Sequence, residues 1–227
     1  MKSLIKRLPI VGPLVRYIHK TYFSADPAFT DSAAYWERRY KRGGDSGIGS
    51  YGHLAEFKAE FLNAFVDSNK VHSVIEYGCG DGNQLRLSNY PQYIGFDVSQ
   101  NAVNRCRTLY VDDSTKSFRH VNEYAGETAP LTLSLDVLYH LVEDSIFDSY
   151  MHRLFDSSTR FVIIYSSNVD SDPATNSKHV RHREFSSWVA QNKPNWQLVN
   201  CTTNKYKFSE TVKVGSVSDF FVYEKKS

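Results

Sequence analysis

Three closely spaced glycines follow a short apolar run, in Glu76-Tyr77-Gly78-Cys79-Gly80-Asp81-Gly82-Asn83. Glycine lets the backbone turn sharply and approach a ligand, because no Cβ stands in the way. A dinucleotide-binding fingerprint would place its third glycine where this chain has Asn83. Gly82 comes one place early, so the spacing weighs against a nicotinamide or flavin dinucleotide.

An acidic residue, Asp97, ends the apolar run that follows this glycine loop. A carboxylate in that place can accept hydrogen bonds from both hydroxyls of a ribose. The order of strand, glycine loop, strand and terminal acid therefore predicts a nucleoside-binding site. A purely structural turn is the alternative interpretation of the glycines.

The chain around this loop alternates between strand and helix patterns. Apolar and β-branched runs predict strands at 71–77, 93–97, 117–121, 131–135, 161–165, 196–199 and 217–223. Apolar residues at helical spacing predict helices over 53–66, 100–109, 146–155 and 184–191, with Ser99 capping the second. Such alternation predicts a mainly parallel sheet with helices on both faces and ligands at the carboxyl ends of its strands. No helix pattern separates the last two strands, so we expect them to pair antiparallel.

The run 74–82 resembles motif I of the class I S-adenosylmethionine-dependent methyltransferases. Residues 95–99 resemble the second motif of that superfamily, and 133–136 resemble its fourth. The resemblance covers the chain from about Ser32 onward. It implies an α/β, Rossmann-like class I methyltransferase fold, whose seven-stranded sheet is mainly parallel with an antiparallel last strand. It also divides the chain into an N-terminal arm, 1–31, and a methyltransferase domain, 32–227.

In that superfamily the glycine loop cradles the methionine part of the cofactor, and the acid in the place of Asp97 holds the ribose. The residue after the third strand borders adenine. Residues 35–40 resemble an N-terminal cap that many small members fold over the cofactor, although these aromatics could instead pack the helix onto the domain. The cofactor-binding residues implied are Tyr35, Trp36, Arg39, Glu76, Gly78, Cys79, Gly80, Asp81, Gly82, Asn83, Asp97, Val98, Asn122, Glu123 and Asp136.

Methyl transfer to an alcohol is helped by a positioned base, because the hydroxyl holds its proton tightly. The best candidate is His140, just past the fourth predicted strand and close to Asp136, the second candidate catalytic residue. An imidazole with a reference pKa of about 6.5 suits proton acceptance near neutrality. A capping or packing role is the alternative for His140.

The long polar stretch after the fifth strand should choose the acceptor, since loops at the carboxyl edge often do so. Its clustered bases could hold an anionic acceptor, or they could be ordinary solvated charges. The expected acceptor-binding residues are Tyr139, His140, Asn168, His179, Arg181 and His182. Asp136, Glu143 and Asp144 could gather Mg²⁺ beside a diol.

The chain has 41% hydrophobic residues and a net charge of +2, which favour one globular domain over a dedicated nucleic-acid binder. Three cysteines without paired spacing indicate a reducing cytoplasm. The arm is basic and amphipathic, so it could rest on the inner face of a membrane or on a glycan-assembly partner. Folding over its own domain, or over the mate in a homodimer, is the alternative.

These features predict O-methylation of a small or glycan-linked hydroxyl, since the compact domain with an arm is similar to bacterial methyltransferases acting on polysaccharides. N- or S-methylation of a small metabolite is an alternative, because such acceptors need no base. A catalytically inactive cofactor-binding scaffold in a glycan-assembly complex is a third.

Overall fold

The computed structural model describes residues 29–170, 177–208 and 215–226. The chain divides into two compact units, Met1–Thr30 and Asp31–Ser227, and the helices and strands of the described residues belong to the second. Residues 1–28 of the predicted arm lie outside the described residues. None of the described helices is long and apolar enough to cross a bilayer.

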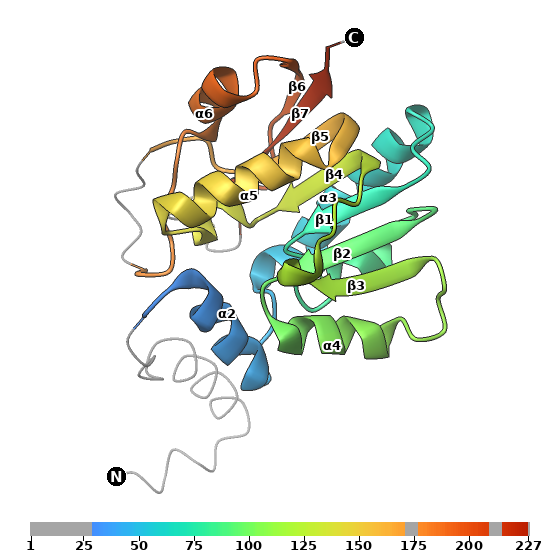
Figure 1. Ribbon diagram of the computed structural model, residues 1–227, viewed down its shortest axis with the longest axis vertical. Coiled ribbons are helices and arrows are strands. Elements are labelled where there is room, and N and C mark those ends of the chain that lie inside the picture. The colour runs from blue at the N-terminus through green and yellow to red at the C-terminus, as the bar shows by residue number, and fades with distance from the viewer. Residues whose placement is uncertain (1–28, 171–176, 209–214, 227) are drawn as a thin grey trace, which may run out of the picture. The chain divides into compact units, whose positions relative to one another are not determined.

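Within the described residues, seven strands form one sheet in the order β3-β2-β1-β4-β5-β7-β6 (Figure 1). Their bounds are β1 Val74–Tyr77, β2 Tyr93–Asp97, β3 Lys116–His120, β4 Ala129–Leu135, β5 Ser158–Ser166, β6 Trp196–Thr202 and β7 Asp219–Lys225. The first five strands pair in parallel, and β7 is antiparallel to both of its neighbours. The predicted sheet and its antiparallel final pair are confirmed.

Helices cover both faces of the sheet (Figure 1). Their bounds are α2 Ser32–Lys41, α3 Gly52–Ser68, α4 Gln100–Leu109, α5 Asp144–Asp156 and α6 Phe185–Asn192. Side chains from α3 and α4 pack with one set of strand residues, and side chains from α5 and α6 pack with the other. Strand side chains alternate between the faces, so Val74 joins the α3–α4 core and Ile75 joins the α5–α6 core.

Hydrogen bonding, rather than apolar content, sets the ends of the strands. The strand predicted at 71–77 begins only at Val74, because the N–H of Val71 donates to the carbonyl of Val66 at the end of α3. The strand predicted at 217–223 is shifted to Asp219–Lys225, because its pairing with β5 begins where Asp219 lies opposite Ser166. The strands predicted at 131–135, 161–165 and 196–199 are each longer than their apolar runs.

Candidate functional site

A cavity of about 720 Å³ opens at the carboxyl ends of β1, β2 and β4. Its walls include Gly78 after β1, Val98 after β2 and Asp136 after β4. Ligand cavities in proteins span about 300–1,000 Å³. The position is the one that parallel α/β sheets use for ligands.

The structure brings about half of the predicted site residues to this cavity. Those that line it are Trp36, Glu76, Gly78, Cys79, Gly80, Asp81, Asp97, Val98, Asn122, Asp136 and His140. The remaining predicted residues are not part of its wall, and they are Tyr35, Arg39, Gly82, Asn83, Glu123, Tyr139, Asn168, His179, Arg181 and His182. Glu123 instead accepts a hydrogen bond from the N–H of His120.

The glycine loop adopts a backbone that requires glycine. Gly78, Gly80 and Gly82 have φ angles of 85°, 58° and 76°, in the left-handed region. A Cβ on Gly78 would lie 2.4 Å from a methyl group of Val137, and one on Gly80 would lie 2.3 Å from Ser46 Oγ. The backbone of the loop therefore packs directly against Val137 and Ser46, with no room for a side chain between them.

Asp97 ties the glycine loop to the end of β2. One carboxylate oxygen accepts from the N–H of Gly80 at 2.9 Å, and the other accepts from the N–H of Ser99 at 2.8 Å. Burial raises the pKa of Asp97 to about 6, although these two hydrogen bonds oppose the rise. Each carboxylate oxygen can accept a second hydrogen bond, so Asp97 can still receive ribose hydroxyls from the cavity.

Glu76 is on β1, and its side chain points to the same face of the sheet as that of Val74, which belongs to the α3–α4 core. The hydroxyl of Tyr93 donates to its carboxylate at 2.7 Å. Burial raises the pKa of Glu76 to about 7. The positive charge of Lys58, which lines the same cavity, opposes this rise.

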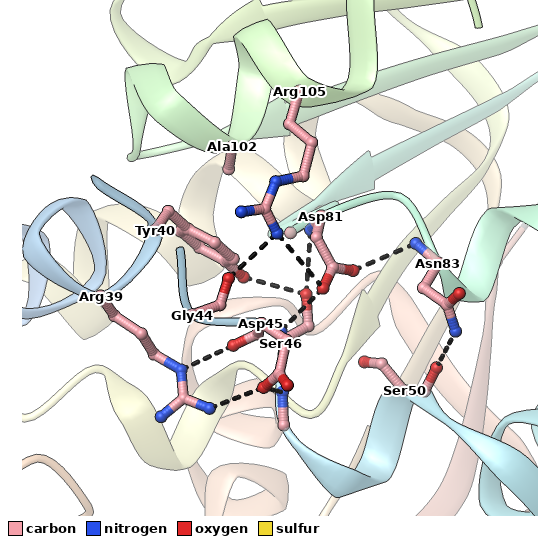
Figure 2. A network of polar contacts seen from close by, with 12 residues as sticks. Arg39, Tyr40, Gly44, Asp45, Ser46, Ser50, Asp81, Asn83, Ala102 and Arg105 are labelled. Atoms are coloured by element: carbon pink, nitrogen blue, oxygen red, sulfur yellow. Dashed lines mark hydrogen bonds and ion pairs between the residues drawn. The ribbon is translucent and has the colours of Figure 1, made fainter. Parts of the chain in front are cut away.

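Asp81 binds the segment 42–51, which follows α2, and Figure 2 shows this network. The N–H of Ser46 donates to the Asp81 carboxylate at 2.9 Å, and the N–H of Asp81 donates to Ser46 Oγ at 2.9 Å. The hydroxyl of Tyr51 donates to the same carboxylate at 2.7 Å. Burial alone would raise the pKa of Asp81, but these hydrogen bonds outweigh it and lower the pKa. The Asp81 carboxylate, predicted to meet the cofactor, thus holds the segment over the glycine loop.

Helix α2 is attached to the domain at its start and at its middle. At its start, the N–H and hydroxyl of Ser32 donate to the carboxylate of Glu143 at 2.9 and 2.6 Å. Further along, Glu37 accepts from the hydroxyl of Ser99 at 2.6 Å. Ser99 also accepts from the N–H of Ala102, so it caps α4 as predicted while it holds α2. We refer to α2 with residues 42–51 as the lid, because it contributes Trp36, Tyr40, Ser46 and Ser50 to the cavity wall.

Asp136 is the centre of a polar cluster rather than a bare carboxylate. It has a φ of 59° and accepts from Lys58 Nζ at 2.7 Å, Tyr139 Oη at 2.9 Å and Ser218 Oγ at 3.0 Å. Lys58 has a side chain only 1% exposed and also lines the cavity. Sequence reasoning missed Lys58. Its signal was a lysine four residues after Leu54, on the apolar face of the predicted helix.

His140 lies at the cavity wall with its ring edge-on to Trp36, at a centroid distance of 4.8 Å. Its Nδ1 is 3.2 Å from the carbonyl oxygen of His179. A carbonyl oxygen only accepts, so Nδ1 carries the hydrogen and Nε2 carries the lone pair. Burial lowers the pKa of His140 to about 4, which keeps the imidazole neutral near pH 7. The ring can therefore accept a proton only at Nε2.

The loop after β5 lies beside a separate hollow that Arg181 and His182 line. Arg181 pairs with Asp144 at 2.9 Å, and His182 Nδ1 is 2.5 Å from Ser167 Oγ. Asn168 bonds to Ser186 at the start of α6. These residues, predicted to bind the acceptor, are each bonded to a different neighbouring side chain, and none of them lines the main cavity.

The carboxylates predicted to gather Mg²⁺ are engaged separately. Asp136 binds Lys58, Glu143 binds Ser32, and Asp144 binds Arg181 and Arg183. Among the described residues, no group of three or more histidine, cysteine, aspartate or glutamate side chains could hold a metal ion. The predicted magnesium site is not supported, because neighbouring cations and lid contacts take its ligands.

The sheet order, the antiparallel β7 and the cavity above the glycine loop define the Rossmann-like methyltransferase fold. The chain is similar to the N-methyltransferase NodS from Bradyrhizobium japonicum WM9, solved with S-adenosylhomocysteine. The TM-score is 0.64 at 14% identity, covering 87% of this chain and 100% of that one. It is also similar to magnesium protoporphyrin IX methyltransferase from Synechocystis PCC 6803 with bound S-adenosylmethionine, at a TM-score of 0.61 and 14% identity, covering 88% and 100%.

A third similar structure is the methyltransferase domain of bacterial CtHen1-C, with a TM-score of 0.60 and 17% identity over 80% of this chain and 100% of that one. No family model and no curated protein matches the sequence. The similar structures therefore establish the fold, and the named acceptors differ among them.

Proposed function

We propose that this protein is an S-adenosylmethionine-dependent methyltransferase. The observation that carries the proposal is the glycine loop joined to Asp97, since Gly80 N–H and the Asp97 carboxylate meet at the floor of the cavity. Asp97 has free acceptor positions for a ribose, and the bare backbone of the loop suits a close ligand. Similar folds that hold S-adenosylmethionine or S-adenosylhomocysteine add support.

When bound, S-adenosylmethionine supplies an activated methyl group on a sulfonium centre. The chain would then contribute mainly alignment, which can account for a large part of such a rate enhancement. His140 lies at the wall near the carboxyl end of β4, and its Nε2 can accept the proton of a hydroxyl acceptor. We therefore favour O-methylation, with His140 as the base.

For the acceptor we favour a hydroxyl of a sugar or glycan. The wall around His140 presents the ring of Trp36 and a neutral imidazole, while the Lys58 charge is paired with Asp136. An aromatic ring and a neutral imidazole can pack against and hydrogen-bond a neutral, polar acceptor such as a sugar. N- or S-methylation of a small metabolite is the second candidate, because the hydrogen bond from His140 to His179 equally suits a packing role.

The test is a screen of hydroxyl, amine and thiol acceptors, including mono- and oligosaccharides, for release of S-adenosylhomocysteine. On the best acceptor, His140→Ala should lower turnover by about 100-fold or more, with affinity for S-adenosylmethionine kept within about twofold. His152→Ala is the matched control, because His152 is on the exposed surface of α5.

Three other outcomes separate the alternatives. Undiminished turnover in His140→Ala would favour an amine or thiol acceptor and remove the histidine from the mechanism. Cofactor binding without turnover on any acceptor would favour a scaffold. The absence of any binding at millimolar S-adenosylmethionine would refute the proposed function as a whole.

A further inference from the structure

The cavity has a further wall, which is formed by one face of α5. Ser145, Ser149 and Arg153 line the cavity, and they are spaced four residues apart, so they lie in one row along the helix. The row spans roughly 12 Å along the helix axis, at a rise of about 1.5 Å per residue. A ligand that reaches both ends of this row must therefore be extended.

The cavity continues from the strand ends onto the face of the sheet beside α5. Tyr77 and Phe96, whose side chains belong to the α5–α6 core, line it together with α5. The connection from β3 to β4 crosses β2 and β1, and its residues, all of them described, form only the short 3₁₀ helix Val121–Glu123. Val121 and Arg153 both line the cavity, so it extends between this connection and α5.

Arg153 is a cation without an acidic partner. Among the residues that the structure describes, its half-buried guanidinium takes part in no hydrogen bond and no ion pair. Its Cζ lies 5.6 Å from the centre of the Tyr124 ring. The acids nearest in sequence to these two residues, Asp156 and Glu127, are each paired with another base. Arg153 therefore keeps all five of its N–H donors for a ligand.

Ser149 places a hydroxyl donor one helical turn before Arg153. The hydroxyls of Ser145 and Ser149 also make no hydrogen bond to any described residue. A guanidinium offers its donors in a fixed fork that matches two oxygens of a phosphate, and contact with an aromatic ring limits its movement. Ser149 can donate to a further oxygen of the same group. Positive charge and unused donors on one wall suit a phosphate group and disfavour an ammonium.

We infer that Arg153 and Ser149 bind a phosphate monoester carried by the methyl acceptor, which is then a phosphorylated sugar or glycan. The inference rests on the proposed function and deepens it. S-adenosylmethionine carries no phosphate, and its one carboxylate belongs to the methionine part, which is expected at the glycine loop. The anion at Arg153 therefore comes from the other ligand of the cavity, the acceptor.

The reacting hydroxyl and the phosphate occupy different parts of such an acceptor. His140 precedes the first residue of α5 by four positions, so the neutral sugar unit that it contacts lies near the start of this helix. Arg153 is about two turns further along α5 than Ser145, since a turn takes about 3.6 residues. The wall around His140 and the wall around Arg153 thus select a neutral and an anionic part of one extended molecule.

The experiment titrates glucose 6-phosphate, glucose and inorganic phosphate into the full chain saturated with S-adenosylhomocysteine, by calorimetry at constant ionic strength. The variants are Arg153→Met, which keeps an apolar side chain against Tyr124 but removes the charge, and Ser149→Ala. Arg160→Met is the matched control, because Arg160 Cζ also lies over a ring, 4.3 Å from the centre of Phe161, but Arg160 is not part of the cavity wall.

We expect glucose 6-phosphate to bind the wild type at least about tenfold more tightly than glucose, and more tightly than inorganic phosphate. Arg153→Met should weaken glucose 6-phosphate by about tenfold or more, and Ser149→Ala should weaken it by about threefold. Affinity for S-adenosylhomocysteine should stay within about twofold in both variants, which also shows that they are folded. Arg160→Met should leave all these affinities unchanged.

Unchanged affinity for glucose 6-phosphate in Arg153→Met would overturn the assignment. An equal loss of affinity for S-adenosylhomocysteine in that variant would also overturn it, because Arg153 would then hold the cofactor. Inorganic phosphate that binds as tightly as glucose 6-phosphate would assign the wall to a free anion instead of the acceptor. A wild-type chain that binds no S-adenosylhomocysteine would overturn the proposed function, whereas Arg153-dependent binding of glucose 6-phosphate to that chain would leave the anion site standing without a role in methylation.

Discussion

Glu76 and Asp97 lie near the carboxyl ends of β1 and β2, and burial raises their pKa values to about 7 and about 6. His140 is shifted in the other direction, to about 4, for the same reason. Burial disfavours the charged form of each group, so it raises the pKa of the two carboxyl groups and lowers the pKa of the imidazole. These opposite shifts make pH a sharp probe of individual residues in this cavity.

The pH dependence of stability should report on Glu76. Its folded pKa of about 7 exceeds its ordinary value of 4.5, so between these two values the folded state binds more protons than the unfolded state. The contribution of Glu76 to the free energy of unfolding therefore falls as pH rises through this window, by on the order of 3 kcal/mol. Glu76→Gln keeps an acceptor for Tyr93 but does not titrate, so it should remove this fall.

Urea unfolding of the wild type and of Glu76→Gln at pH 5 and pH 8 gives the change in the free energy of unfolding between these pH values for each protein, and the two changes are then compared. The comparison is needed because His140, with a lowered pKa, contributes a change of opposite sign between about pH 4 and pH 6.5. If the free energy of unfolding changed equally with pH in the wild type and in Glu76→Gln, burial would not be holding Glu76 in its protonated form.

The pH dependence of turnover should report on His140. Because its pKa is lowered to about 4, the imidazole is already neutral at pH 5 and can accept a proton there. The turnover rate on a hydroxyl acceptor should therefore stay constant as pH is lowered to about 5, and it should not fall to half near pH 6.5. The measurement is kcat against pH with saturating cofactor and acceptor. An inflection near 6.5 that disappears in His140→Gln would contradict the buried, neutral state.

At the scale of elements, two carboxylates on the rest of the domain help to hold the lid in place. Glu143 holds the start of α2 through Ser32, and Asp81 holds the segment 42–51 through Ser46 and Tyr51. Hydrogen bonding to the ionised form outweighs burial and lowers the pKa of both carboxyl groups. The cavity wall includes lid residues, so ligand exchange requires some of these contacts to open.

Ser46→Ala should accelerate ligand release. The change removes the hydroxyl that accepts from Asp81 N–H and contacts Tyr40 Oη, and it leaves the glycine loop unaltered. Losing the hydrogen bond from Asp81 N–H, which joins the lid to the glycine loop, should destabilise the closed lid by about 1–2 kcal/mol, corresponding to a dissociation rate roughly 5- to 30-fold higher. Stopped-flow displacement of S-adenosylhomocysteine measures this rate.

Asp45→Ala is the control for that experiment. Asp45 pairs with Arg39 and accepts from Gly47, so its contacts lie within the lid and do not join it to the domain. Its dissociation rate should stay close to that of the wild type. Equal rates for the Ser46 and Asp45 variants would mean that the Ser46–Asp81 contact does not limit opening.

Local sequence patterns predicted the parts of this site that depend on neighbouring residues. The glycine loop, Asp97 and the Ser99 cap each follow from a few adjacent positions, and the mainly parallel sheet follows from repeated strand–helix alternation. Contacts between distant segments were not predictable in this way. Nothing local pairs Lys58 with Asp136, or Ser32 with Glu143, because such contacts depend on how the helices pack across the sheet.

At the scale of the whole molecule, the sheet separates two cores that share none of the described residues. On β5, Phe161 and Ile163 belong to the core with side chains of α3 and α4, and Val162 and Ile164 belong to the core with side chains of α5 and α6. Residues on opposite faces of the same strands thus stabilise both cores. The cavity lies at the strand ends, so its geometry depends on both cores being intact.

The chain that begins at Asp31 should fold on its own and retain the cavity. All the described residues of both cores lie at or beyond Phe57, and the described residues of the cavity wall lie at or beyond Asp31. Removing residues 1–30 should therefore change the free energy of unfolding by less than about 1 kcal/mol, which is small for a domain of this size. Affinity for S-adenosylhomocysteine should stay within about twofold of the full chain, as calorimetry can measure. A destabilisation of several kcal/mol would instead show that the arm packs on this domain as part of its fold. If stability is unchanged but the shortened chain no longer forms a dimer in sedimentation, the arm belongs to a homodimer interface.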